Sequence, residues 1–170
     1  TGRTATRKFY EQVVAWAHRH RVVVVQDAAH MMLSYDERPL SFLSIDGAKD
    51  VGLEVHSMSK GFHMIGWRMG WVCGHERLVR AFADIKDNCD SGQFIAIQKA
   101  AAAALADPEI PRLVREKYRR RLEKLVGVLR AVGFDCEMPG GTYFLYTKSP
   151  VGAGNRVFTT AQEASQFLIH

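Results

Sequence analysis

Four consecutive valines, Val22 to Val25, constrain the fold more than any other feature of the sequence. The run is too short for a helix, and it is apolar on both faces of an extended chain. Such a run is typical of a strand in a parallel sheet that helices cover. It ends abruptly at the polar pair Gln26-Asp27. Further short strands are predicted near Gly52 to Ser57 and from Arg68 to Cys73.

Apolar residues at helical spacing fill the intervals between and after these strands. The predicted helices cover residues 4–20, 76–86, 92–106 and 110–132, and a last one begins near Thr159. Thr4 or Thr6 suits the N-cap of the first helix, and Gly133 suits the end of the longest. The alternation of strands and helices predicts an α/β fold with a largely parallel sheet.

The second part of the chain has a different pattern. Two strand-like stretches, Phe134 to Glu137 and Thr142 to Thr147, flank Pro139-Gly140-Gly141 and predict a hairpin. We therefore expect a large α/β domain over residues 1–109 and part of a small α+β domain over residues 110–170, joined by the helix 110–132. Because the chain starts at Thr1 rather than Met and is still helical in pattern at its last residue, we expect a fragment of a longer protein.

Composition excludes several classes of protein. Hydrophobic residues make up 47% and charged residues 24%, as in folded domains rather than disordered ones. The longest apolar runs are too short to cross a membrane. Cys73, Cys89 and Cys136 are odd in number and show no CxxC spacing, which argues against a disulfide framework and a zinc knuckle. A reduced, cytoplasmic protein is expected.

The charge balance has two interpretations. Lys and Arg total 23 against 18 Asp and Glu, giving a formal charge of +5. Much of the excess lies on the polar face of the predicted helix 110–132, between Arg112 and Lys124. That face would suit nucleic acid, but a solvated helix face is favoured because no aromatic platform interrupts the basic residues.

Lys60 is the most informative residue. It directly follows a predicted strand, and the carboxyl ends of strands border the crevice where α/β sheets bind ligands. An amine there can form an imine with a carbonyl compound. Ser57 and Arg68 are suited to a phosphate, because one offers a hydroxyl and the other a planar, permanently charged fork. A lysine near serines is also common in surface turns.

Asp27 ends the valine strand, and we expect it at the same edge of the sheet as Lys60. Taken alone, it is equally well explained as a turn or capping residue. A carboxylate, a lysine and an arginine together suit a ring with a basic nitrogen, an aldehyde and a phosphate, which are the groups of pyridoxal 5′-phosphate.

Over essentially its whole length the sequence resembles the class I/II aminotransferases of pyridoxal phosphate fold type I. The resemblance is carried by Ser57-x-Ser59-Lys60 with Gly66-x-Arg68-x-Gly70, by Asp27 33 residues upstream, and by Thr1-Gly2, similar to the end of an Asn-Pro-x-Gly motif. The stretches Gln26-Asp27-Ala28-Ala29 and Pro139-Gly140-Gly141-Thr142-Tyr143 are most similar to the bacterial LL-diaminopimelate aminotransferase subfamily and its relatives. This resemblance implies a three-layer α/β large domain and a small α+β domain.

The resemblance also implies roles for individual residues. Lys60 would form the imine with pyridoxal 5′-phosphate and then move the substrate proton. Asp27 would pair with the ring nitrogen of the cofactor. Ser57 and Arg68 would bind its phosphate, with Ser59 as a weaker candidate for the same role.

Two positions depart from the family pattern. His30 stands where the family usually has a tyrosine that donates a hydrogen bond to the phenolic oxygen of the cofactor. A neutral imidazole can donate one such bond, although a structural histidine is nearly as well supported. His63 stands where the lysine motif usually has a small residue or asparagine.

The activity that the resemblance implies is amino transfer from an amino acid to a 2-oxo acid, in lysine biosynthesis for the subfamily named. The full-length protein would be a homodimer without nucleic-acid or membrane partners, and no metal spacing is seen among its histidines. The same residues would serve a C–S lyase or a cyclopropane-carboxylate synthase-like enzyme. An aminotransferase-like domain of a DNA-binding regulator is a further alternative.

Overall fold

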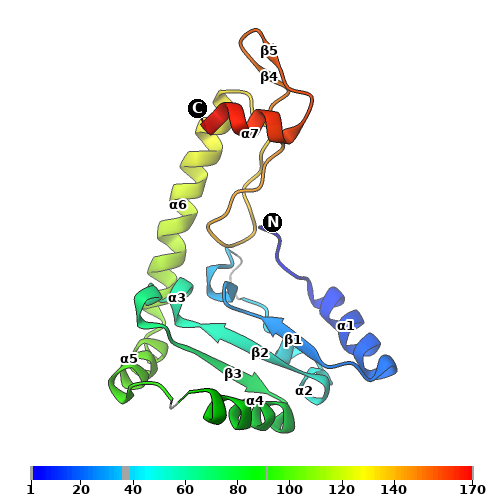
Figure 1. Ribbon diagram of the computed structural model, residues 1–170, viewed down its shortest axis with the longest axis vertical. Helices are drawn as coiled ribbons and strands as arrows, with labels where there is room; N and C mark the ends of the chain where they lie inside the picture. Colours follow the sequence, from blue (N-terminus) through cyan, green and yellow to red (C-terminus); the bar gives the residue numbers. More distant parts are fainter. Residues whose placement is uncertain (1, 36–38, 91, 170) are drawn as a thin grey trace.

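The structure, a computed structural model, describes residues 2–35, 39–90 and 92–169, so the sequence expectations drawn from Thr1 and His170 lie outside the described residues. A sheet with helices around it forms one end of the molecule, and the long helix α6 (Glu109–Ala131) leads away from it toward the C-terminal segment (Figure 1). The predicted α/β class is confirmed.

The main sheet has the strand order β1-β2-β3, with β1 at Val24–Asp27, β2 at Gly52–Ser57 and β3 at Gly70–Gly74. Strands β1 and β2 are parallel, as predicted, but β3 runs antiparallel to β2. The sheet is therefore mixed rather than largely parallel. A parallel connection usually needs a crossover helix. Only the short turns α3 (Met58–Gly61) and η3 (Ile65–Trp67) separate these two strands, so the chain reverses its direction.

One core lies on the face of the sheet that carries Val24. Helix α1 (Arg7–His20), the turn η2 (Phe42–Ser44) and α2 (Ala48–Val51) supply its buried residues, which are Tyr10, Val14, Phe42, Ile45 and Ala48. Thr6 is the N-cap of α1, as predicted, and its Oγ1 accepts a hydrogen bond from the Phe9 amide at 3.2 Å. On the other face Val25 is 62% exposed, so the prediction of a strand covered on both faces is wrong for the described residues.

A second core surrounds α3. Its buried residues Met58, Phe62, Met64 and Ala101 bring α3 against α5 (Ile95–Ala106), and α4 (Glu76–Cys89) packs along β3. Helix α6 ends where the sequence predicts, because Gly133 adopts a φ of +93° and the Phe134 amide donates to the Leu129 carbonyl at 2.9 Å. No helix in the described ranges is long and apolar enough to cross a membrane.

The predicted hairpin over 134–147 is wrong. In the described part of the chain, these residues form only an isolated bridge, between Gly141 and Ser34. The segment returns to the sheet end of the molecule, where the Thr142 amide donates to the Leu33 carbonyl at 2.9 Å. Nearby, the Gly140 amide donates to the Gly2 carbonyl at 2.8 Å. Backbone groups far away in sequence thus replace the expected partner strand.

The antiparallel pair of this region lies further along the chain. It consists of β4 (Gly152–Ala153) and β5 (Arg156–Val157), and α7 (Ala161–Ile169) follows. The predicted start of the last helix is confirmed, since the Glu163 carboxylate accepts from the Thr159 amide at 2.7 Å and the Glu163 amide donates to Thr160 Oγ1 at 3.2 Å. The bond to Thr160 is one half of a capping box, while the Glu163 carboxylate binds Thr159, one residue before the N-cap, rather than the N-cap amide itself.

Candidate active site

Asp27 and Lys60 lie at the same edge of the sheet. Strands β1 and β2 are parallel, and Asp27, the last residue of β1, lies opposite Val55 near the end of β2. The Asp27 Oδ1 atom accepts a hydrogen bond from the Ala29 amide at 3.1 Å, which fixes the turn after the strand. The carboxylate itself is exposed. It is therefore both oriented and accessible.

Lys60 follows β2 within the single turn of α3. Ser57 caps this turn, because its Oγ accepts a hydrogen bond from the Ser59 amide at 3.1 Å. Ser59 itself is buried, with 5% exposure. The Lys60 side chain is half-buried, and its Nζ lies 5.7 Å from the centre of the Tyr143 ring. The aromatic face attracts an ammonium group at this distance and so limits the positions of the side chain.

His30 lies close to both of these charged groups. Its Nδ1 shares a hydrogen bond of 2.8 Å with Thr142 Oγ1, and its ring lies 5.3 Å from that of Tyr143. Burial lowers the pKa of His30 below its usual value, the positive charge of Lys60 lowers this pKa further, and Asp27 acts in the opposite sense. Lys60, Asp27 and His30 are therefore close enough to influence one another electrostatically.

The pairing of β2 with β3 brings the backbone of Ser57 close to that of Arg68. Gly70, two residues after Arg68, pairs with Ser57 across β2 and β3. A Cβ at Gly70 would lie 2.5 Å from the His56 carbonyl oxygen, so only glycine allows this close approach. The side chains of Ser57 and Arg68 make local contacts: Ser57 caps α3, and the exposed Arg68 guanidinium donates to the Ile65 carbonyl at 3.1 Å.

Three of the residues predicted to bind the cofactor line two different cavities. Asp27 and His30 line a cavity of about 290 Å³, together with Thr142. Arg68 lines a second one of about 490 Å³. The structure thus brings Asp27, His30 and Lys60 into one neighbourhood, whereas Arg68 lines a different cavity.

Sequence reasoning missed the aromatic wall of this site. Tyr143 links His30 and Lys60 to α6, where the ring of Tyr118 lies 5.1 Å away. The His63 ring lies 5.6 Å from Tyr118 in an edge-to-face arrangement. Helical spacing alone places Tyr118 among the apolar residues of its helix, and Tyr143 enters the sequence analysis only through the family resemblance.

Thr142 was missed as well. Its φ is +66°, an unusual conformation for a β-branched residue that costs of order 1–3 kcal/mol. The backbone bond to Leu33 and the side-chain bond to His30 hold it there. A strained residue that contacts a candidate catalytic group is typical of functional sites. No sequence signal marks a positive φ at a threonine.

The chain matches the model of the family described as aminotransferase class I and II over residues 1–169, and it belongs to this family. It is 55% identical over 169 residues to the LL-diaminopimelate aminotransferase of Methanocaldococcus jannaschii, covering 99% of this chain and 40% of that protein. It is 51% identical to the enzyme of the same name from Methanococcus maripaludis, covering 99% of this chain and 41% of the relative.

Among solved structures, the apo form of BacF from Bacillus subtilis matches with a TM-score of 0.90 at 33% identity, covering 99% of this chain and 44% of that one. The expected fold of the class I/II aminotransferases is thereby confirmed, as is the resemblance to the LL-diaminopimelate aminotransferases. The chain spans about 40% of the length of the curated relatives that it matches.

The family depends on pyridoxal phosphate in general, and the chemistry of the residues described above fits this cofactor. Asp27 offers an oriented carboxylate for a basic ring nitrogen, and Lys60 offers an amine beside an aromatic face. Ser57 and Arg68 offer a hydroxyl and a guanidinium for a phosphate.

Proposed function

We propose that the protein containing this chain is a pyridoxal phosphate-dependent aminotransferase that moves an amino group from an amino acid to a 2-oxo acid. The observation that carries this proposal is the pairing of β1 with β2, which sets the Asp27 carboxylate and the Lys60 amine at one sheet edge, with His30 close enough to feel both charges. A fixed acid and a fixed amine at that edge suit a cofactor with a basic nitrogen and an aldehyde.

In this proposal each charged residue holds one part of the cofactor. Lys60 binds the aldehyde carbon through its Nζ, Asp27 keeps the ring nitrogen protonated, and Ser57 and Arg68 bind the phosphate. When bound, pyridoxal phosphate supplies an electron sink for the pair of electrons left when a Cα–H bond breaks. The Lys60 Nζ atom would take up that proton as a general base.

His30 donates a hydrogen bond to the phenolic oxygen of the cofactor in this proposal. Its lowered pKa keeps the imidazole neutral at pH 7. The Thr142 hydroxyl can donate to Nδ1, and in that tautomer Nε2 carries the ring proton and is the donor to the cofactor. The bond to Thr142 is compatible with the tautomer that His30 needs in this proposal.

We expect His30→Ala to move the absorbance transition of the bound cofactor to higher pH, because a donor to the phenolic oxygen best stabilises the form in which the adjacent nitrogen has lost its proton. His30→Tyr should retain most of the activity, since the tyrosine hydroxyl can donate a similar bond. Spectrophotometric pH titration of the two variants and the parent tests this. Identical titration of all three would make His30 structural only.

The substrate proposal rests on the relatives. Those at 55% and 51% identity bear the name LL-diaminopimelate aminotransferase, and we extend this activity, a step of lysine biosynthesis, to the full-length protein. The same proposal includes a cytoplasmic homodimer and a division into a large domain over 1–109 and a small domain over 110–170. Another fold type I reaction, such as C–S bond cleavage, is the competing assignment.

The experiment is an assay of the purified full-length protein with LL-diaminopimelate as donor and 2-oxoglutarate as acceptor. Formation of glutamate that depends on both substrates, with a ping-pong rate law, is the expected result. Release of ammonia and pyruvate from a sulfur-containing amino acid, without glutamate formation, would instead favour the lyase.

A further inference from the structure

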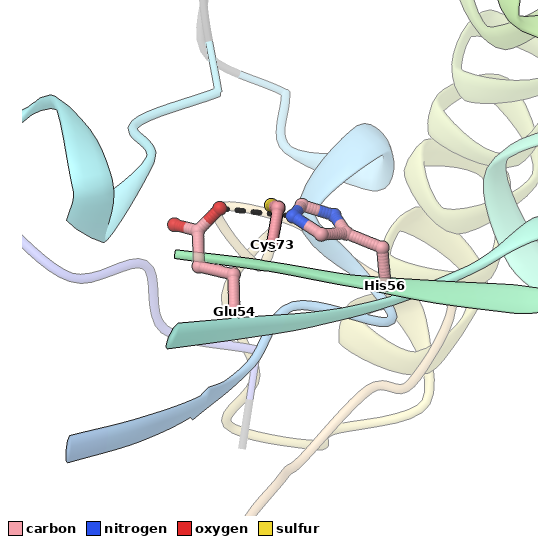
Figure 2. A group of neighbouring side chains, drawn as sticks. All are labelled: Glu54, His56 and Cys73. Atoms are coloured by element: carbon pink, nitrogen blue, oxygen red, sulfur yellow. Dashed lines mark hydrogen bonds and ion pairs between the residues drawn. The ribbon is translucent and has the colours of Figure 1, made fainter. Parts of the chain in front are cut away.

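Three side chains that the proposed chemistry does not use converge on the face of the sheet that carries Val24. Glu54 and His56 alternate along β2, and Cys73 lies opposite Glu54 on β3 (Figure 2). One ligand atom from each side chain lies within 4.8 Å of the other two. Glu54 is 2% exposed and His56 is 7% exposed, so this is a buried polar cluster between two strands.

Neighbouring groups orient two of these side chains. The Glu54 Oε1 atom accepts hydrogen bonds from Ser41 Oγ at 2.8 Å and from the Leu43 amide at 3.3 Å. Its Oε2 atom is thereby directed to His56 Nε2, 2.9 Å away. The His56 ring stacks on Trp71 with a centroid distance of 4.7 Å and an interplanar angle of 3°. Such outer contacts are what hold metal ligands in position.

From this geometry we propose that Glu54, His56 and Cys73 form a zinc site, with one coordination position left for water. A carboxylate oxygen, an imidazole nitrogen and a thiolate are the ligand types that Zn²⁺ prefers, and three protein ligands with one open position are a common arrangement. The binding chemistry rests on these three side chains alone and is independent of the proposed aminotransferase activity.

The required movements are small. On tetrahedral Zn²⁺, with bonds of about 2.0–2.2 Å, a nitrogen and an oxygen ligand lie about 3.3 Å apart. The Glu54 Oε2 and His56 Nε2 atoms are 2.9 Å apart, and the three ligand atoms lie within 4.8 Å of one another, so shifts of about 1 Å would bring them to zinc distances. Cys73 is only partly buried, which leaves a path for the ion and for the water.

The electrostatics of Cys73 in the metal-free protein are also compatible with a zinc site. Burial raises the pKa of the Cys73 thiol, and the negative charge of Glu54 raises it further. The thiol therefore stays protonated beside the carboxylate, and Zn²⁺ would bind by displacing that proton. A bound ion would join β2, which leads to Lys60, with β3, which follows Arg68.

The test uses the untagged full-length protein, first treated with a chelator and then dialysed against Zn²⁺. We expect one Zn²⁺ per chain, and X-ray absorption at the zinc edge should show one sulfur neighbour at about 2.3 Å with nitrogen and oxygen neighbours at about 2.0–2.2 Å. Cys73→Ser, which is nearly isosteric, should weaken zinc binding by at least about 100-fold. Cys89→Ser, an exposed cysteine outside the cluster, should bind as the parent does.

A zinc neighbour shell without sulfur would overturn the proposal, as would equal affinity in Cys73→Ser and the parent. The absence of bound zinc after dialysis would do the same. The absorption spectrum of zinc in the parent protein requires no substitution, so the site can be judged even if a variant folds poorly. Because none of these measurements uses amino transfer, failure of the zinc site and failure of the aminotransferase proposal are distinguishable.

Discussion

Lys60→Ala in the full-length protein is expected to lower the rate of amino transfer by more than about 10⁴-fold, because one side chain serves as both nucleophile and base. Only a lysine combines an amine that can attack an aldehyde with a stem long enough to reach the substrate proton as well. Arginine at this position would keep the charge, but its guanidinium stays protonated and forms no such bond.

Borohydride reduction gives this prediction a readout besides turnover. In the parent protein, reduction with pyridoxal phosphate present should leave the cofactor covalently on the peptide that contains Lys60, as identified by mass mapping. Lys60→Ala should lose the adduct and still bind cofactor in part, through Asp27, Ser57 and Arg68. An adduct on Lys49 or Lys86 instead, or undiminished turnover in Lys60→Ala, would refute the assigned site.

Asp27→Asn is expected to lower turnover by about 10²- to 10³-fold, an effect of about 3–4 kcal/mol on the barrier. The asparagine oxygen can still accept the hydrogen bond from the Ala29 amide, so the turn after β1 should persist. What is lost is the negative charge that would hold a proton on the ring nitrogen, and with it much of the capacity to accept electrons.

Matched measurements separate this charge effect from misfolding. Thermal unfolding of Asp27→Asn should resemble that of the parent, and Asp27→Glu, which keeps the charge, should retain more activity than Asp27→Asn. Steady-state kinetics and calorimetry on the three proteins test this expectation. Equal turnover in Asp27→Asn and the parent would be incompatible with a pairing role.

The sequence was most informative where structure is decided locally. The long helix α6 and its stop at Gly133 follow from spacing and from one glycine with positive φ, and both were predicted to within a residue or two. The sheet edge that carries Asp27 and Lys60 was equally open to prediction, because Asp27 ends one recognisable strand and Lys60 lies in the short turn after the next.

The direction of strand β3 and the hydrogen-bond partners of residues 134–147 were harder to predict from the sequence. Whether β3 runs parallel or antiparallel to β2 depends on how the twelve residues between them turn, and short helical turns leave little sequence signal. Residues 134–147 have a strand-like sequence, but the Gly140 and Thr142 amides donate to the distant Gly2 and Leu33 carbonyls. Between the two stretches, the Thr147 hydroxyl donates to the Asp135 carbonyl at 3.0 Å, a side-chain bond rather than a strand pairing. Thr142 and Tyr143 join the site through those distant contacts, so no local pattern assigned them to it.

The bond between His30 and Thr142 joins residues 112 positions apart in the chain. Closing so large a loop is entropically costly and must await the ordering of the sheet and α6 between them. We therefore expect the β1–β2 edge with Asp27 and Lys60 to form before Tyr143 packs near Lys60, because the contacts of Tyr143 join residues far apart in the chain. The candidate site is therefore complete only when the distant segments of the chain have packed together.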